Sequence, residues 1–267
     1  MQARLFSIFR LSWPLFARGI FWVGFYGVIL ISWVLLVKMN ASPLPGMTAA
    51  EYWAALCVSA GSSNPSLIFS MWALMSAAMM LPTFVPAARV FGDLGSVDAT
   101  SAGSMTALAL GYLSAWLIFA SAATTLQILL AKAGALSDAG QLLNPWITAI
   151  LLGISGGYQF SASKMACLSK CRHPLLFFME YWKPGYWPAF SMGVRLGLWC
   201  IGCCWLLMLI GFIGGAMNVL WMGAATIFMV FEKLPEFGRF VTKPLGVILI
   251  GAALIKFVIL MTVGGQL

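Results

Sequence analysis

The stretch GVRLGLWCIGCCWLLMLIGF, residues 193–212, decides the fold class of this chain. Only one of its twenty residues, Arg195, is charged, and about 20 apolar residues are what an α-helix needs to cross the hydrocarbon core of a bilayer. The whole sequence is 62% hydrophobic and 8% charged, whereas a soluble domain carries about 25% charged residues. Transmembrane strands would alternate polar and apolar residues, which these runs do not do. The sequence therefore predicts an all-α fold, a polytopic transmembrane helix bundle.

Apolar runs of similar length recur along the chain and predict about seven membrane spans within a single transmembrane domain, residues 1–267. Lysine and arginine collect in the cytoplasmic loops of membrane proteins. If the N-terminus lies inside, twelve of the fifteen Lys and Arg residues fall on the inner side, two fall outside and Lys256 lies in the last span. This asymmetry predicts an inside N-terminus and an outside C-terminus. The expected spans are residues 19–38, 67–89, 104–131, 144–164, 193–212, 215–232 and 244–263.

The net charge of +8 would suggest a nucleic-acid partner in a soluble protein. Here the basic inner loops account for the charge, so the expected partner is the lipid bilayer and not nucleic acid. The outer loop after the first span is expected to hold a short amphipathic helix around residues 51–58. The sequence shows no convincing internal repeat and no soluble domain.

Three cysteines lie within five residues of the opening stretch. Cys200 is three residues before Cys203 and four before Cys204, so on a helix all three thiols crowd onto one face. Met208 continues the same face one turn further along. This spacing predicts a cluster of sulfur atoms inside the membrane.

Two further sets of sulfur-bearing residues flank this cluster. Cys167 and Cys171 are four residues apart at the inner end of the fourth predicted span. Methionines recur every four residues in the second span, and a rise of about 1.5 Å per residue places Met75 and Met79 at the level of the cysteine triplet, with Met71 nearer the outer side. Pro82 and Pro86 follow and are expected to kink that helix and free carbonyl groups. The methionines are Met71, Met75 and Met79 with Met80 beside them, while Met208, Met217 and Met222 lie toward the outer side.

Thiol and thioether groups are soft ligands that select Cu(I), so these residues form a candidate copper site. Zinc held by four thiolates is an alternative, but it would leave the methionines without a role. Disulfides are not expected, because five of the six cysteines lie inside or within the membrane, where thiols stay reduced. Buried cysteine and methionine also serve as packing residues, and the pattern alone leaves that interpretation open.

Ionisable side chains are few in the predicted spans. Glu232 and Lys233 close the sixth span near the inner interface, where long side chains reach water by extending along the apolar surface. The one histidine, His173, lies in an inner loop and cannot build a histidine-rich site. The sequence contains no Ser/His/Asp set, no phosphate-binding loop and no dinucleotide fingerprint. We therefore expect a protein that is not an enzyme.

Four blocks of the sequence, in order, resemble the signature blocks of a bacterial family of predicted metal-binding integral membrane proteins with a domain of unknown function. The resemblance covers about residues 65–235 and implies a multi-pass protein of the bacterial inner (cytoplasmic) membrane. One departure is Leu196, where that family often has a histidine. The blocks are MWALMSAAMMLP (71–82), GYQFSASKMACLSKCRHP (157–174), GLWCIGCCWLLM (197–208) and GGAMNVLWMGAATIFMVFEKLP (214–235). The set that the resemblance implies is Met75, Met79, Met80, Cys167, Cys171, Cys200, Cys203, Cys204, Met208, Met217 and Glu232 with Lys233.

These observations lead to three hypotheses about function. The first is a metal-handling membrane protein that binds Cu(I) through the Cys/Met cluster for delivery or transport, with a copper chaperone or a cuproenzyme as its partner. The second is an auxiliary subunit of a larger membrane complex, in which the sulfur atoms only fill space. The third is a thiol redox enzyme using Cys167 and Cys171, whose spacing differs from the thioredoxin type.

Overall fold

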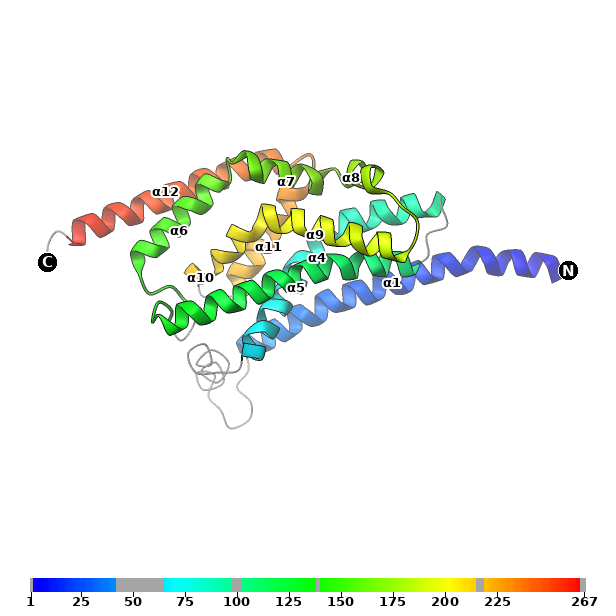
Figure 1. Cartoon of the computed structure of the whole chain (residues 1–267), viewed down its shortest axis with the longest axis horizontal. Coiled ribbons are helices and arrows are strands. Elements are labelled where there is room, and N and C mark those ends of the chain that lie inside the picture. The colour runs from blue at the N-terminus through cyan, green and yellow to red at the C-terminus, as the bar shows by residue number, and fades with distance from the viewer. Residues whose placement is uncertain (1, 42–64, 98–101, 138–139, 215–218, 265–267) are drawn as a thin grey trace, which may run out of the picture.

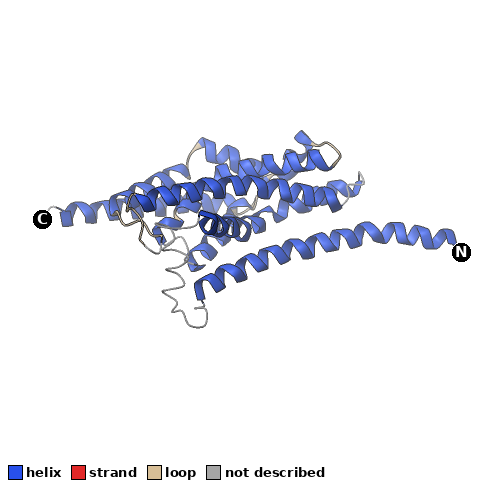
Figure 2. Cartoon of the chain, turned by 60° about the horizontal axis from the view of Figure 1, so that its bottom comes forward, coloured by secondary structure: helices blue, strands red, loops and turns tan. Residues whose placement is uncertain are grey.

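The structure is a computed structural model that describes residues 2–41, 65–97, 102–137, 140–214 and 219–264. Within these ranges the chain forms helices joined by short turns, and no strand is present (Figure 2). This confirms the all-α prediction. The expected helix around residues 51–58 lies outside the described ranges. The helices are α1 (Gln2–Ala41), α4 (Pro65–Val97), α5 (Ala102–Lys132), α6 (Pro145–Tyr158), α7 (Ala162–Arg172), α8 (Pro174–Tyr181), α9 (Tyr186–Leu209), α10 (Gly211–Gly214), α11 (Val219–Lys233) and α12 (Gly238–Gly264).

Five of the described helices are long and apolar enough to cross a membrane, judged by length and composition. Their apolar windows coincide with five of the predicted spans, and large apolar side chains such as Val23 (76% exposed) face outward from them. Such exposure would be costly in water and is what lipid-facing helices show. The windows are Arg18–Val37, Pro65–Leu94, Gly103–Lys132, Tyr186–Gly214 and Phe240–Thr262.

The prediction of seven spans is not confirmed, because two of the predicted spans form shorter helices. Helix α6 has 14 residues, which extend about 21 Å, less than the roughly 30 Å of a hydrocarbon core. It stops at Tyr158, and Ser161 starts α7 by accepting a hydrogen bond from the backbone N–H of Lys164. Helix α11 has 15 residues within the described part of the chain. The break between α6 and α7 was not predicted, because apolar residues continue on both sides of it.

The helices form a bundle whose long axis follows most of their lengths (Figure 1). Helix α5 packs against α9 and α4, α1 packs against α4, and α7 packs against α9. Helices α6 and α12 pair along one side of the bundle. The described ends of α1 and α12 point to opposite ends of the long axis.

Helices α5 and α9 are in backbone contact, because glycines lie at their crossing. A Cβ atom at Gly193 would overlap the carbonyl of Leu108, and one at Gly111 would overlap the carbonyl of Phe190. Gly197, one turn beyond Gly193, also lies close to α5, because a Cβ atom there would be 2.7 Å from the Cβ of Ala115. Small residues permit such close approach between membrane helices. This crossing fixes the height of α9 relative to α5.

Glycines elsewhere in the bundle differ in how closely they approach a neighbouring helix. A Cβ at Gly157 or Gly211 would meet no atom within 4 Å, and one at Gly153 would make an ordinary contact with Ala253. Gly156 makes the close approach instead, because a Cβ there would lie 2.9 Å from the backbone nitrogen of Ile250 in α12. Gly156 is therefore the glycine of α6 that touches the backbone of α12.

Pro82 in α4 lacks the N–H that would pair with the carbonyl of Ala78, four residues earlier. The indole Nε1 of Trp33 in α1 donates a hydrogen bond to that carbonyl at 3.0 Å. The carbonyl of Ala78, which Pro82 leaves without a partner inside α4, therefore joins α1 to α4.

Replacing Trp33 by phenylalanine is expected to lower the free energy of unfolding in detergent by about 1 kcal/mol, the usual worth of one such bond. In a Pro82→Ala background the new N–H at residue 82 can pair with Ala78, so the same substitution should cost less. Denaturant titration of the four proteins in this cycle measures the difference. Equal costs in both backgrounds would contradict the role of the freed carbonyl.

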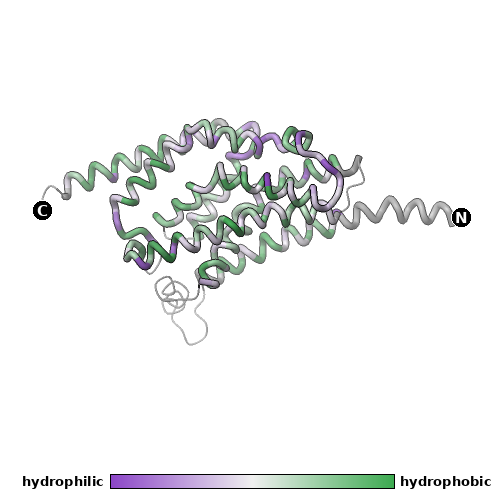
Figure 3. Tube along the Cα trace, in the orientation of Figure 1, coloured by the Kyte–Doolittle hydropathy of each residue, from purple (hydrophilic) through white to green (hydrophobic). Residues whose placement is uncertain are grey.

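Polar residues gather where α7, α8 and the start of α9 meet, whereas α12 is apolar along most of its length (Figure 3). The turn at the end of α7 follows from the sequence, since residues before a proline avoid the helical region. Arg172 is the last residue of α7, and Pro174 opens α8 at its first position, where proline is well tolerated. This turn separates the short helix α7 from α8.

Candidate metal centre

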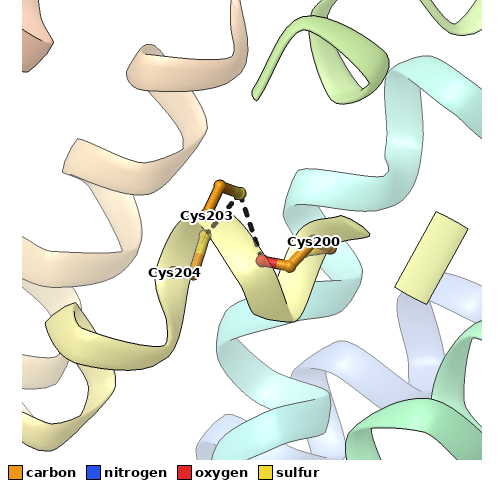
Figure 4. Close-up of side chains that lie close together, drawn as sticks. All are labelled: Cys200, Cys203 and Cys204. Atoms are coloured by element: carbon orange, nitrogen blue, oxygen red, sulfur yellow. Dashed lines mark hydrogen bonds between the residues drawn. The ribbon is translucent and has the colours of Figure 1, made fainter. Parts of the chain in front are cut away.

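The three thiols of α9 lie together, as their spacing predicts (Figure 4). Their sulfur atoms are all within 4.8 Å of one another. Cys203 Sγ lies 3.2 Å from Cys204 Sγ, and its thiol donates to the backbone carbonyl of Cys200 at 3.1 Å. All three side chains are buried and none forms a disulfide. The membrane helix thus carries a compact set of soft donor atoms.

Helix α7 adds two half-buried thiols to this set. The thiol of Cys171 interacts with those of Cys200 and Cys203. Cys167 lies over Gly202, where a Cβ atom would be 2.6 Å from its sulfur. The sequence placed this pair at the inner edge, apart from the cluster of α9. The structure joins the two groups, because α7 is a separate short helix that packs along α9.

Polar groups from three other helices surround Cys200. The ammonium of Lys233 in α11 donates to Cys200 Sγ at 2.8 Å and to Thr83 Oγ1 at 2.7 Å. The hydroxyl of Tyr112 in α5 lies 3.0 Å from Cys200 Sγ and donates to the carbonyl of Met80 at 3.2 Å. The ammonium of Lys233 therefore favours a negative charge on the sulfur of Cys200.

The expectation that Glu232 and Lys233 extend to the interface is wrong. Lys233 is 5% exposed and Glu232 is fully buried. Each has polar partners inside the bundle, and a buried charge is retained only when it is paired. Glu232 lies 2.7 Å from Lys164 Nζ in α7. A window of hydropathy places such residues at a helix end, but only the tertiary fold shows that other helices cover that end.

The methionines of the predicted set are buried where the structure describes them. Met75, Met79 and Met80 of α4 and Met208 of α9 are each at most 3% exposed. Met80 also contributes its backbone carbonyl, which accepts from Thr83 and Tyr112. Their thioethers as metal ligands stay a prediction. Met217 lies outside the described residues.

Sequence reasoning missed several residues of this region. Tyr112 and Thr83 carry no motif, and nothing in their local sequence separates them from other polar residues in apolar helices. Lys164 and Arg172 counted as basic residues of an inner loop, yet both are buried.

An exposed ion pair joins α7 to α8. Lys170 Nζ is 2.7 Å from Glu180 Oε2 of α8. The hydrogen bond raises the pKa of Lys170 above its ordinary value and lowers that of Glu180 below it. Both shifts favour the charged forms, so the ion pair contributes a little to folding stability while both groups are charged. This contribution is lost as pH falls through the lowered pKa of Glu180, and also as pH rises through the raised pKa of Lys170.

A cluster of this composition suits a soft monovalent ion. Thiolates prefer Cu(I) and zinc to hard cations, which take oxygen ligands. Cys200 has an ammonium donor and a tyrosine hydroxyl beside its sulfur, and such outer partners orient ligand atoms and tune the metal. The half-buried thiols of α7 give this buried cluster a side that is partly open.

The comparisons with known proteins agree with this chemistry. A family model described as PpoB2, copper chaperone, matches residues 69–256, a range that includes the cysteines of α7 and α9. No curated protein and no solved structure matches the chain.

Proposed function

The chain belongs to the PpoB2 copper chaperone family, and from this premise we propose that it is a multi-pass protein of the bacterial inner membrane that binds Cu(I) at the α7–α9 sulfur cluster and passes it to a partner. We define this cluster as Cys171, Cys200, Cys203 and Cys204, with Cys167 beside it. The partner is a copper carrier or a cuproenzyme that takes the ion by exchange between sulfur ligands.

One observation carries the proposal: three thiols of a single apolar helix lie within 4.8 Å of one another, buried and free of disulfides. Packing alone does not require three cysteines on one face, since alanine and valine are small apolar residues that could fill a similar space. The polar shell around Cys200 also serves no packing purpose. It stabilises a thiolate, and the thiolate is the form that binds metal.

The path of the ion follows from exposure. Cys167 and Cys171 are half-buried, whereas Cys200, Cys203 and Cys204 are at most 1% exposed. The ion would reach the thiols of α7 first and then the deeper sulfurs of α9. Each step exchanges one sulfur for another, so the ion need not be hydrated within the membrane. The methionines of α4, with Met208 and Met217, would continue the path outward.

We place the N-terminus inside, with seven crossings of the membrane region. In this arrangement α6 with α7, and α11, carry the chain back through the bundle between the five long helices. The described ends of α1 and α12 point to opposite ends of the long axis, which fits an odd number of crossings. The basic residues then gather on the cytoplasmic side.

The purified protein, reduced and loaded with Cu(I), is expected to retain about one copper ion per chain after gel filtration, because buried thiolates hold Cu(I) strongly. Elemental analysis measures copper and zinc together. The same protein loaded with Zn(II) should lose the zinc when Cu(I) is added in equal amount.

Two results would remove the proposal. One is reduced, folded protein that elutes without copper. The other is zinc that stays bound when Cu(I) is offered, which would make this a structural zinc site.

A further inference from the structure

Helix α7 is tied to α11 by two basic residues, one near each of its ends. Lys164 lies in the first turn and Arg172 is the last residue. Both reach the same residue of α11, Glu232. A helix of 11 residues has little stability of its own, so such contacts decide where α7 lies.

The contact at the first turn is a fully buried ion pair. Lys164 Nζ lies 2.7 Å from Glu232 Oε1, and both side chains have no exposed surface. The same ammonium donates a hydrogen bond to Gln159 Oε1, just before α7 begins. A buried ion pair adds little net stability compared with apolar residues, but it accepts only a narrow geometry, and fixing a register is the best-attested use of such pairs.

The contact at the last turn uses the backbone of Glu232. Arg172 Nε donates to the Glu232 carbonyl at 2.9 Å, and Arg172 Nη2 donates to Thr242 Oγ1 of α12 at 3.1 Å. A Cβ atom at Gly238 would overlap both the Glu232 carbonyl and the Arg172 guanidinium. The glycine at the start of α12 thus leaves room for this second contact.

These contacts set the position of the cysteines of α7. Cys167 and Cys171 are three and seven residues after Lys164, which places them close to the same face of the helix. Cys171 meets the thiols of α9, and Cys167 lies against Gly202. A shift of α7 by one turn, about 5.4 Å, would take Cys171 out of reach of Cys200 and Cys203.

We propose that Lys164 and Glu232 are positioning residues that hold α7 in the register where Cys171 completes the sulfur cluster. The role of this register in copper binding rests on the proposed function. The register itself does not, and it can be tested without metal.

The test is cross-linking of Cys171 to Cys200 or Cys203 by the two-electron oxidant diamide, in membranes that contain the metal-free protein. Mass spectrometry of the disulfide-linked peptides gives the yield. Membranes are used so that a variant that does not survive detergent is still measured. Wild type should cross-link efficiently, and Lys164→Gln and Glu232→Gln should each lower the yield by about tenfold, since each leaves one buried group without its charged partner.

Two controls separate register from general damage. Lys170→Gln removes an ion pair from the exposed side of the same helix and should leave the yield unchanged. The exchanged pair Lys164→Glu with Glu232→Lys keeps opposite charges in place and should recover most of the yield. Unchanged yields in both single glutamine variants would overturn the proposal. So would an exchanged pair that remains as poor as either single variant.

Copper loading gives the second measurement. X-ray absorption should show one sulfur ligand fewer around copper in Glu232→Gln than in wild type. If wild type binds no copper, the proposed function fails while the cross-linking result still decides the register. If copper binds with the same sulfur number in both proteins, Cys171 is not a ligand and the link between register and metal binding is lost.

Discussion

Replacing Cys200, Cys203 and Cys204 together by serine is expected to leave the purified protein without copper. Three of the four thiols of the cluster would be gone, and a hydroxyl is a poor ligand for a soft ion. Even loss of partners that only support a ligand lowers metal affinity by about 10–100-fold, so loss of three ligands should exceed about 100-fold. Competition with a Cu(I) chelator of known affinity measures the change.

The matched control is a buried sulfur that lies outside the predicted set. Met229 in α11 is fully buried, and Met229→Leu preserves volume while removing a thioether. Copper affinity should not change in this variant. The double variant Met75→Leu with Met79→Leu tests whether the methionines of α4 bind copper. A lower copper affinity would extend the site to α4, and an unchanged copper affinity would restrict it to the thiols. Unchanged copper content in the triple serine variant would contradict the cluster as the binding site.

Gly193→Ala is expected to disrupt the bundle, although it adds one methyl group. The new Cβ would overlap the carbonyl of Leu108, which belongs to the backbone of α5 and cannot move aside as a side chain can. The two helices must separate along their whole crossing, and we expect a loss of about 3 kcal/mol or more in the free energy of unfolding. Denaturant titration in detergent, followed by tryptophan fluorescence, measures this loss.

Gly251→Ala is the matched control for that substitution. Gly251 lies within α12, where a Cβ atom would meet nothing within 4 Å. Alanine is a better helix former than glycine by about 1 kcal/mol, so this variant should be as stable as wild type or slightly more stable. If Gly193→Ala behaves like Gly251→Ala, the two helices are not in backbone contact.

The sequence was sufficient for the long helices because their length and hydropathy are local properties. Five predicted spans coincide with helices of adequate length. The break at residues 159–161 escaped prediction because Gln159 and Ser161 are too few to interrupt an apolar average. Whether a short helix still crosses the bilayer region depends on how α6 and α7 follow one another, which is a property of the fold.

The candidate metal centre was likewise predictable from the sequence only in part. The grouping of Cys200 with Cys203 and Cys204 follows from helical periodicity alone, and the structure confirms it. The approach of Cys171 does not, because it depends on where α7 packs. Lys233 was visible as a charge at a helix end, but its bond to Cys200 joins residues 33 positions apart, and no local pattern encodes such a pair.

The backbone contact between α5 and α9 also bears on how copper would move along the proposed path. Helices that touch through glycines cannot slide past each other without breaking that contact. We therefore expect the three thiols of α9 to keep their position relative to α5. On the proposed path the ion would enter from the side of α7, whose two thiols are half-buried. A copper donor that docks there would reach Cys167 and Cys171 before the buried thiols of α9, and the ion would then pass from one sulfur ligand to the next.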